Sequence, residues 1–385
     1  MYKRKLDLSS SAKESCFLWG PRQTGKSTLL KTLFPKAMYY DLLLSDQYRR
    51  LVANPSLLRQ ECEALGLDGK NQNFPIIIDE VQKIPDLLDE VHWMIENRGL
   101  RFILCGSSPR KIKKSSGSLL GGRALRHRLF PLIFPEIPDF SLLKALNHGL
   151  LPRHYLAQKA DKFLETYVGD YLKEEIVAEA STKNIPAFSR FLETAALSNG
   201  EIVNFNNIAS ECAVSAPTAK AYFQILADTL IGTWIQAFRK TVKRRLISAP
   251  KFVFFDVGIV SHLAYRGKIT QGSELFGRAF EHFIILEILA HSHYSDINYP
   301  LQYWRTASQF EVDLILGRGE VAIEIKSTTS AKDRHLKGLR AFKEEHNAKY
   351  ILVSLDPKPR KTSDGILILP WKDFLENLWE DKIIG

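Results

Sequence analysis

Near the start of the chain, the segment GPRQTGKST at positions 20–28 has the composition and spacing of a loop that binds phosphate groups. Gly20 and Gly25 allow a tight backbone turn in which several N–H groups point at one anion. Lys26 is expected to reach the β and γ phosphates of a nucleotide, and Ser27 to bind Mg²⁺. The expected nucleotide contacts also include Pro21, Arg22, Gln23, Thr24 and Thr28. A predicted strand precedes the loop and a predicted helix follows it, which is the context that this motif requires.

An acidic pair follows the apolar run PIII at residues 75–78, where a buried strand is predicted to end. Asp79 is expected to hold the Mg²⁺ shell, and Glu80 to orient or deprotonate the water that attacks the nucleotide. The alternative is that both acids cap the following helix, an interpretation that the upstream phosphate loop disfavours. The pair therefore predicts a nucleotide hydrolase rather than a protein that only binds nucleotide.

Two serines end another apolar run, FILCGSS at residues 102–108. A hydroxyl of Ser107 or Ser108 at the end of a strand can hydrogen-bond the γ-phosphate or the attacking water. An ordinary helix cap or turn is the competing explanation for serines at this place. Both serines are therefore candidates for nucleotide contact.

A second group of chemically active residues lies far along the chain, in EVDLILGRGEVAIEIK at residues 311–326. Side chains alternate along a strand, so Glu324 and Lys326 share a face, and the intervening GRG turn predicts a hairpin that brings Asp313 beside Glu324. Two carboxylates placed in this way can share Mg²⁺, which prefers oxygen ligands. Lys326 can then position a water or stabilise a pentacovalent phosphate.

Apolar residues in the same hairpin are expected to point away from the acids. Those of the first strand are Val312, Leu314 and Leu316, and those of the second are Val321, Ile323 and Ile325. The competing interpretation is an exposed hairpin in which the acids and the lysine form surface ion pairs of little energetic consequence.

The elements that must position these residues fall into three stretches. Residues 1–140 alternate strand and helix patterns, as in an α/β domain. Residues 140–250 are mainly helical, with an amphipathic helix predicted at 161–180. From residue 251 onward strands return, together with a long helix predicted at 273–293.

A helix, turn and helix are predicted at residues 205–231, followed by the strand-like GTWIQAF as a wing. This is the layout of a winged helix-turn-helix, whose second helix can enter the major groove of DNA. The candidate contacts on the second helix are Thr218, Lys220 and Gln224. The basic residues that can neutralise phosphates are Arg239, Lys240, Lys243, Arg244 and Arg245. Winged helices also serve as packing modules, so DNA contact and a structural role both remain open.

Composition indicates the class of protein and the cellular compartment in which it is expected. The length of 385 residues predicts two or three domains, and 45% hydrophobic with 25% charged residues is typical of a globular protein. The net charge of +10 fits a nucleic-acid partner or an anionic surface. The cysteines, which have no metal-ligand spacing, are Cys16, Cys62, Cys105 and Cys212. The start of the chain lacks a signal peptide and no apolar run is long enough to span a membrane, so a cytoplasmic protein with no membrane partner is expected.

Four motifs in order, GPRQTGKSTLL, IIIDEVQKIP, ILCGSS and SLLGGRALRHRLFPLIFPE, resemble the AAA+ ATPases of bacteria and archaea that carry a C-terminal domain of uncharacterised function. The resemblance covers nearly the whole chain. It implies a sensor at Ser107 or Ser108 and a functional arginine at Arg123, which approaches nucleotide in its own or a neighbouring subunit. Arg126 and Arg128 are the alternatives. Rings are common among AAA+ proteins, which leaves a homo-oligomer open.

The aspartate on one strand and the E-x-K on the next resemble the core of PD-(D/E)XK nucleases. That resemblance adds an acid from the preceding helix, and Glu281 stands in that place as a metal ligand beside Asp313 and Glu324. One departure is Val312, which stands where the motif's name has proline. The metal ligands themselves are all present.

The sequence thus predicts a multidomain α/β protein of three parts. They are a P-loop AAA+ domain at 1–138, a helical lid and winged helix at 139–250, and an α/β restriction-endonuclease-like domain at 251–385. The expected cofactors are ATP and Mg²⁺. The expected function is ATP hydrolysis that acts on nucleic acid, DNA rather than RNA, with Mg²⁺-dependent cleavage as a second activity. The alternative is an ATP-driven switch or scaffold that binds a protein partner and carries an inactive nuclease-like domain.

Overall fold

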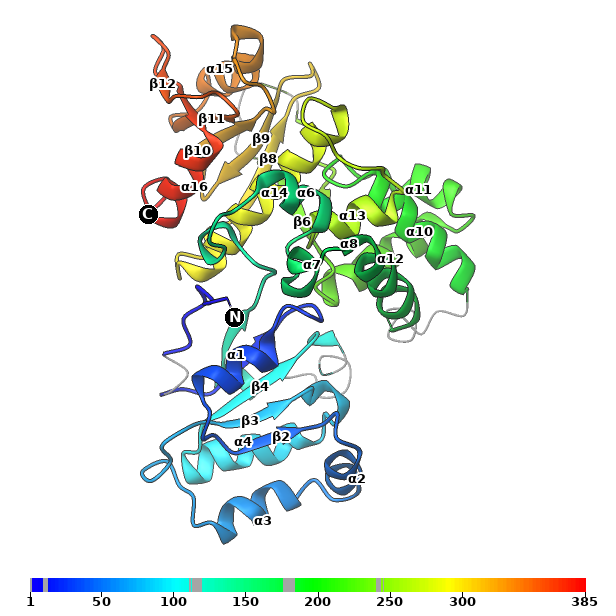
Figure 1. Ribbon diagram of the computed structural model, residues 1–385, viewed down its shortest axis with the longest axis vertical. Coiled ribbons are helices and arrows are strands. Elements are labelled where there is room, and N and C mark those ends of the chain that lie inside the picture. Colours follow the sequence, from blue (N-terminus) through cyan, green and yellow to red (C-terminus); the bar gives the residue numbers. More distant parts are fainter. Residues whose placement is uncertain are drawn as a thin grey trace. The chain divides into compact units, whose positions relative to one another are not determined.

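The chain forms two compact units in the computed structural model shown in Figure 1. The residues that the structure describes are 2–9, 13–110, 112, 120–175, 184–239, 244 and 246–385. The first unit, called here the N-terminal unit, contains Lys3–Phe130 and Asp228–Ile231. The second, the C-terminal unit, contains Tyr2, Pro131–Ala227 and Gly232–Gly385.

A parallel sheet forms the centre of the N-terminal unit, with the strand order β2-β3-β4-β1-β5. Its strands are β1 (Cys16–Trp19), β2 (Tyr39–Asp41), β3 (Ile76–Asp79), β4 (Phe102–Gly106) and β5 (Leu125–Arg128). Its helices are α1 (Lys26–Leu33), α2 (Ser45–Ala53), α3 (Leu57–Ala64) and α4 (Leu87–Arg98). Every residue of β1, β3 and β4 is buried, which explains why these strands are apolar on both faces.

The carboxyl ends of the strands in this unit carry the predicted chemistry. The phosphate-binding loop follows β1, and Asp79 is the last residue of β3. Because β4 lies between β1 and β3, the serines that follow β4 lie between the loop and the acidic pair. This arrangement agrees with the α/β fold class predicted for this part of the chain, while the boundary at residue 138 stays a prediction.

An eight-stranded mixed sheet organises the C-terminal unit, in the order β12-β13-β11-β10-β9-β8-β6-β7. Its strands are β6 (Gly232–Ala237), β7 (Lys251–Phe254), β8 (Leu301–Arg305), β9 (Glu311–Leu316), β10 (Val321–Ile325), β11 (Lys349–Ser354), β12 (Arg360–Lys361) and β13 (Leu367–Pro370). The predicted wing strand β6 pairs with β7 and also with β8. It is therefore part of the same sheet as the acidic hairpin, while the boundary at residue 250 stays a prediction.

The helices of the C-terminal unit that come before its main strands are α6 (Leu142–His148), α7 (Pro152–Leu156), α8 (Ala160–Thr166), α10 (Ile185–Leu197), α11 (Phe205–Glu211) and α12 (Ala216–Asp228). The later ones are α13 (Val257–Leu263), α14 (Glu274–Tyr294), α15 (Lys337–Lys343) and α16 (Trp371–Trp379). The helix predicted at 161–180 runs as α8 and then as a π-helix over Tyr167–Glu175. Residues 176–180 lie outside the described part of the chain.

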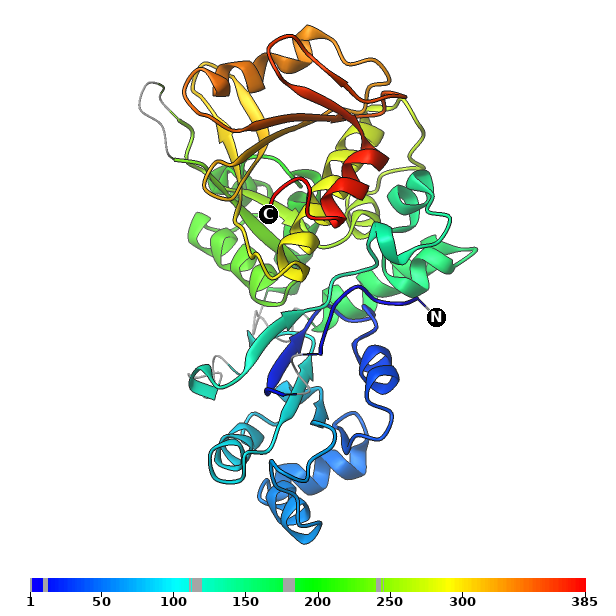
Figure 2. The same cartoon turned by 90° about the vertical axis from the view of Figure 1, so that its left-hand side faces the viewer.

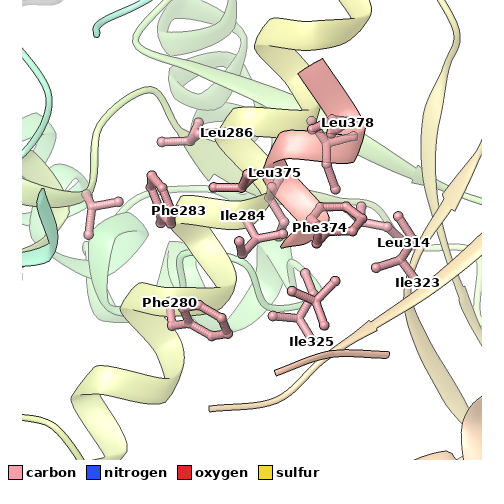
Figure 3. Close-up of a cluster of buried hydrophobic side chains, with 14 of the residues drawn as sticks. Phe280, Phe283, Ile284, Leu286, Leu314, Ile323, Ile325, Phe374, Leu375 and Leu378 are labelled. Carbon is pink, nitrogen blue, oxygen red and sulfur yellow. The ribbon is translucent and has the colours of Figure 1, made fainter. Parts of the chain in front are cut away.

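Two apolar clusters cover the faces of the large sheet. In the first, Phe280 and Phe283 of α14 and Phe374 of α16 pack with Leu314 and with the β10 residues (Figure 3). Helices α14 and α16 lie side by side, as Figure 2 also shows. In the second cluster, Phe342 of α15 and Trp304 of β8 pack with residues of β9 and β11. The sheet is therefore buried on both faces where the acidic hairpin crosses it.

Candidate functional site

The phosphate-binding loop is held in its turn by its own backbone and by Thr24. Gln23 and Gly25 have φ angles of 63° and 94°, in the left-handed region that glycine tolerates best. Thr24 Oγ1 donates a hydrogen bond to the carbonyl oxygen of Pro21 at 2.9 Å. Helix α1 begins directly after this turn, so its first N–H groups face the loop and favour an anion there.

Two cationic side chains contact the same loop. Lys26 Nζ donates to the carbonyl oxygens of Gly20 at 2.8 Å and Pro21 at 3.1 Å, which keeps the ammonium at the loop. Arg4 Nη1 donates to the carbonyl oxygen of Thr24 at 2.6 Å, and its Nη2 donates to that of Phe130 at 2.7 Å. Arg4 was not among the predicted site residues, because nothing in its local sequence indicates contact with a loop twenty residues later.

Asp79 is the centre of the expected Mg²⁺ site. The residue is 2% exposed, and its Oδ2 accepts hydrogen bonds from Ser27 Oγ at 2.6 Å and from the Tyr39 hydroxyl at 2.5 Å. Burial and then the bond to Asp79 raise the pKa of Tyr39, so this hydroxyl keeps its proton. The fold thus brings together the two residues that the sequence assigned to Mg²⁺, Ser27 and Asp79. Tyr39 is a partner that the sequence analysis missed.

Glu80 is joined to Ser107 through a glutamine. Glu80 has a φ angle of 59°, and its carboxylate accepts a hydrogen bond from the side-chain amide of Gln82. The same Gln82 Nε2 donates to Ser107 Oγ at 3.0 Å. Ser108 Oγ accepts instead from the backbone N–H of Arg110 at 3.4 Å, as a turn serine does. The candidate base and the candidate sensor Ser107 are therefore coupled, and Gln82 is a further residue that sequence reasoning missed.

Arg123 lies at the opposite end of the sheet from the phosphate-binding loop of its own chain. Strand β5 pairs with β1 so that Leu125 stands beside Cys16 and Arg128 beside Trp19. The loop follows Trp19, whereas Arg123 precedes Leu125 and forms an ion pair with Glu96. The structure therefore does not bring Arg123 to its own nucleotide site. Contact with nucleotide in a neighbouring subunit stays a prediction.

The two alternative arginines occupy different positions along β5. Arg126 is exposed, whereas Arg128 is at the end of the strand that faces the loop. The Arg128 guanidinium stacks over the Phe130 ring at 4.5 Å. Of the three arginines, Arg128 therefore lies at the same end of the sheet as the phosphate-binding loop.

The acidic hairpin forms as predicted from the GRG turn, with β9 and β10 antiparallel and Leu314 opposite Ile323. On the other side of β9, Gln302 pairs with Ile315 and Trp304 with Val312, so β9 carries one extra residue between Val312 and Ile315. This is a β-bulge, a device that re-aims side chains. Asp313 lies within this bulge.

The bulge changes which face some residues occupy. Leu314, Leu316 and the predicted β10 residues belong to the cluster that includes α14, in agreement with the prediction. Figure 3 shows Leu314, Ile323 and Ile325 of this group. Val312 packs in the cluster on the other face, with Ile315. The expectation that Val312 shares a face with Leu314 is therefore wrong, because the extra residue interrupts the alternation of side chains.

Asp313, Glu324 and Lys326 meet at the end of this hairpin. Lys326 Nζ lies 2.6 Å from Glu324 Oε1 and 3.4 Å from Asp313 Oδ2. Asp313 and Glu324 are each 6% exposed, so the group is not a surface ion pair. Burial alone would lower the pKa of Lys326, but the charges of Asp313 and Glu324 raise it above its ordinary value. Lys326 is therefore charged.

Helix α14 supplies the third predicted acid, Glu281. Burial and then the charge of Asp313 raise the pKa of Glu281 to about 7, while Lys251 and Lys326 act in the opposite direction. Lys251 Nζ lies 2.7 Å from Glu311 Oε1, and its own pKa is raised by Glu281, Glu311 and Asp313 against the effect of burial. Lys251 and Glu311 extend the cluster, and sequence reasoning had not assigned either of them a role.

Glu324 has one oxygen that fits a cation. Its Oε2 is buried and has no hydrogen-bond partner among the described residues. Helix α15 comes close here, because a Cβ on Gly338 would lie 1.8 Å from the Glu311 carbonyl oxygen and 3.6 Å from Glu324 Oε2. Within the described parts of the chain, no three histidine, cysteine, aspartate or glutamate side chains are already grouped as a metal site. Lys326 contacts the other carboxylate oxygen of Glu324, Oε1, and therefore leaves Oε2 available.

The two helices predicted at residues 205–231 are present as α11 and α12, and an antiparallel pair, β6 and β7, follows them, while the winged-helix assignment stays a prediction. Lys220 and Gln224 are exposed on α12, and Thr218 Oγ1 lies 2.8 Å from Ser215 Oγ at the turn. Arg244, one of the predicted phosphate contacts, donates to the Ala341 carbonyl oxygen at 2.6 Å. Of the other predicted basic residues, Arg239 is exposed, while Lys240, Lys243 and Arg245 lie outside the described residues.

Comparison with known families divides the chain into three stretches. Residues 12–138 match the family model described as AAA domain. The parallel sheet, the phosphate-binding loop and this match define the N-terminal unit as a P-loop ATPase domain of the AAA class. Residues 139–270 match a domain of unknown function (DUF8612), and residues 276–374 match another (DUF4143).

Two curated relatives, uncharacterized proteins of Mycobacterium tuberculosis and Mycobacterium bovis, are each 25% identical over 325 residues, which is 81% of this chain and 70% of theirs. A Walker-type ATPase of Pyrococcus abyssi aligns over 67% of this chain and 95% of its own, at 14% identity and a TM-score of 0.45. A signal transduction ATPase with a tetratricopeptide repeat sensor from Pyrococcus horikoshii aligns over 77% of this chain and 48% of its own, at 14% identity and a TM-score of 0.24. Among the described residues, no helix has the length and apolar character needed to span a membrane.

Proposed function

We propose that this ATPase hydrolyses ATP with Glu80 as the base and couples hydrolysis to work on nucleic acid, DNA rather than RNA. The observation that carries the first part is the Asp79 carboxylate, which accepts from Ser27 at 2.6 Å beside the phosphate-binding loop. Ser27 and Asp79 would hold Mg²⁺, which neutralises charge on the phosphates when bound. Lys26 binds the β and γ phosphates.

The residues around Glu80 support its role in taking a proton from water. Gln82 donates to both Glu80 and Ser107, which fixes the carboxylate relative to the end of β4. Ser107 is then placed to hydrogen-bond the γ-phosphate or the attacking water. Water attack on the γ-phosphorus, with the proton passing to Glu80, gives ADP and phosphate.

The second part of the proposal is phosphodiester cleavage at the acidic cluster. It is supported by Glu324 Oε2, a buried oxygen without a partner among the described residues, in a group with Asp313 and Lys326. Glu281, Asp313 and Glu324 would hold Mg²⁺, which supplies Lewis acidity and an activated water when bound. Lys326 stabilises the added negative charge on the phosphate. The helix-turn-helix with the β6–β7 pair, as a winged helix, would contact the nucleic-acid backbone through Lys220 and Arg239.

One observation favours the alternative of an ATP-driven switch that binds a protein. Lys326 already pairs with both carboxylates, and an ion-paired cluster of this kind can serve the fold alone. The two candidate functions predict different effects of nucleic acid on the rate of ATP hydrolysis. Steady-state ATP hydrolysis should rise severalfold with single- or double-stranded DNA if the proposal is right, with Glu80→Gln as the inactive control. A rate that ignores both DNA and RNA would favour the switch.

A further inference from the structure

Helices α6, α8 and α13 pack against one another in the C-terminal unit (Figure 1). They line a pocket with a volume of about 690 Å³. The volume lies in the range of sites for small organic ligands, roughly 300–1,000 Å³. All lining residues fall within 141–164 and 261–269, so the pocket belongs to neither the phosphate-binding loop nor the acidic cluster. We infer that this pocket binds a nucleoside phosphate.

The charges that line the pocket are mostly positive. Lys144, Arg266 and Lys268 face it, against the single carboxylate of Asp161. No described carboxylate forms an ion pair with any of the three cations. Burial and then the positive charge of Arg278 lower the pKa of Arg266, with Glu201 opposing them. A bound phosphate would supply the negative charge that these cations lack, and arginine is suited to phosphate by its fork of N–H groups.

One buried hydroxyl at the pocket, that of Ser261, can still form hydrogen bonds. Ser261 is 7% exposed, and its Oγ has no hydrogen-bond partner among the residues that the structure describes. Leaving a buried polar group without a partner costs about 1–3 kcal/mol, so such groups usually meet a ligand or water. Phosphate oxygens accept from a hydroxyl, which fits Ser261.

The rest of the pocket suits the organic part of such a ligand. Leu143, Leu164 and Ile269 contribute an apolar wall, against which a flat base can pack. The segment that carries Arg266 and Lys268 is fixed by Asn147, whose Oδ1 accepts from the Ile269 N–H at 2.9 Å and whose Nδ2 donates to the Ile269 carbonyl oxygen at 3.0 Å. A preformed site of this kind loses little entropy on binding.

The test uses the full chain with Lys26→Ala, which disables the phosphate-binding loop and leaves the pocket intact. Equilibrium dialysis with AMP should show one saturable site. Lys268→Ala and Arg266→Gln, added singly, should each weaken binding about tenfold, which corresponds to about 1.4 kcal/mol. Lys268 is exposed, so its variant tests the charge without disturbing the fold, as a thermal melt will confirm. Lys162→Ala, an exposed lysine of α8 outside the pocket, is the matched control and should bind AMP unchanged.

Two further ligands, adenosine and inorganic phosphate, test whether the pocket recognises the phosphate group or the nucleoside of AMP. Adenosine should bind at least about tenfold more weakly than AMP, and inorganic phosphate should compete with AMP. Equal binding of adenosine and AMP would overturn the inference. The inference would also be wrong if AMP showed no saturable binding at millimolar concentration, or if neither Lys268→Ala nor Arg266→Gln weakened AMP binding. Binding of a DNA oligonucleotide without binding of AMP would likewise overturn it.

Discussion

The carboxylate of Asp313 accepts a hydrogen bond from the backbone N–H of Ile325, with 2.7 Å between Oδ2 and N. Strands β9 and β10 are paired as far as Leu314 and Ile323, and the Ile325 N–H is the next donor that points toward β9. A side chain thus replaces a backbone carbonyl where the two strands part. Asp313 therefore has a structural role as well as its proposed chemical one.

Substitutions at Asp313 should separate these two roles. Asp313→Ala leaves the Ile325 N–H without an acceptor and should lower the free energy of unfolding by about 1–3 kcal/mol. Asp313→Asn keeps an oxygen acceptor and should cost less, while both variants lose any metal-dependent activity. Chemical unfolding of the two variants checks this. Equal stability of Asp313→Ala and wild type would contradict the structural role.

Glu80 should be needed for ATP hydrolysis and not for ATP binding. Glu80→Gln removes the group that accepts the proton from water, so the rate should fall by roughly 10²–10⁴-fold. Binding of a fluorescent ATP analogue should change little, because Lys26 and the loop backbone are intact. Asp89→Asn, an exposed acid of α4, serves as the control. A Glu80→Gln protein that still hydrolyses ATP at the wild-type rate would remove Glu80 from the mechanism.

Whether a contact could be predicted depends on how far apart its two residues are in the sequence. The loop at Gly20–Ser27 was predictable because its chemistry lies in consecutive residues. The role of Gln82 depends on β4 lying between β1 and β3, which is a long-range pairing that local patterns do not encode. Arg4 contacts carbonyl groups 20 and 126 residues away, and Lys251 pairs with a carboxylate 60 residues away.

In the acidic cluster too, local sequence patterns predicted only part of the structure, although the interacting residues are close in sequence. The sequence predicted the hairpin and the proximity of Asp313, Glu324 and Lys326. It did not predict the bulge at Asp313, because alternation gives the face of a residue only in a regular ladder. Val312 was misplaced for that reason.

Arg4 is expected to stabilise the conformation of the phosphate-binding loop. Arg4→Ala removes two hydrogen bonds, to the carbonyl oxygens of Thr24 and Phe130, and should weaken ATP binding by about tenfold because the loop loses its fixed shape. The exposed neighbour Lys3 provides a control, Lys3→Ala. Titration with the ATP analogue measures both. If the two variants bind ATP equally well, Arg4 has no part in shaping the loop.

Glu287 should make the stability of the chain depend on pH. Its oxygens accept from the Phe134 N–H and from Trp379 Nε1, both at 2.8 Å. Burial raises its pKa from 4.5 to about 8, so the folded chain holds a proton that the unfolded chain releases. The resulting contribution to the free energy of unfolding is fully present below about pH 4.5 and is lost as the pH rises to about 8. Within this window the free energy of unfolding should fall by up to about 1.4 kcal/mol for each pH unit.

Chemical unfolding at pH values across this window measures the effect. Glu287→Gln cannot ionise, so its free energy of unfolding should fall less than that of wild type as the pH rises. Glu376→Gln, an exposed acid of α16, should keep the wild-type slope. Identical slopes for Glu287→Gln and wild type would show that Glu287 is not the group responsible.

Cleavage of nucleic acid tests the central claim most directly. End-labelled single- and double-stranded DNA and RNA would be incubated with the full chain, with Mg²⁺ or Mn²⁺, and with or without ATP. The proposed function predicts cleavage, preferably of DNA, that is lost in Glu324→Gln and Lys326→Ala and altered in Glu80→Gln. Absence of cleavage by a wild-type protein that still hydrolyses ATP would contradict the nuclease role and favour the ATP-driven switch.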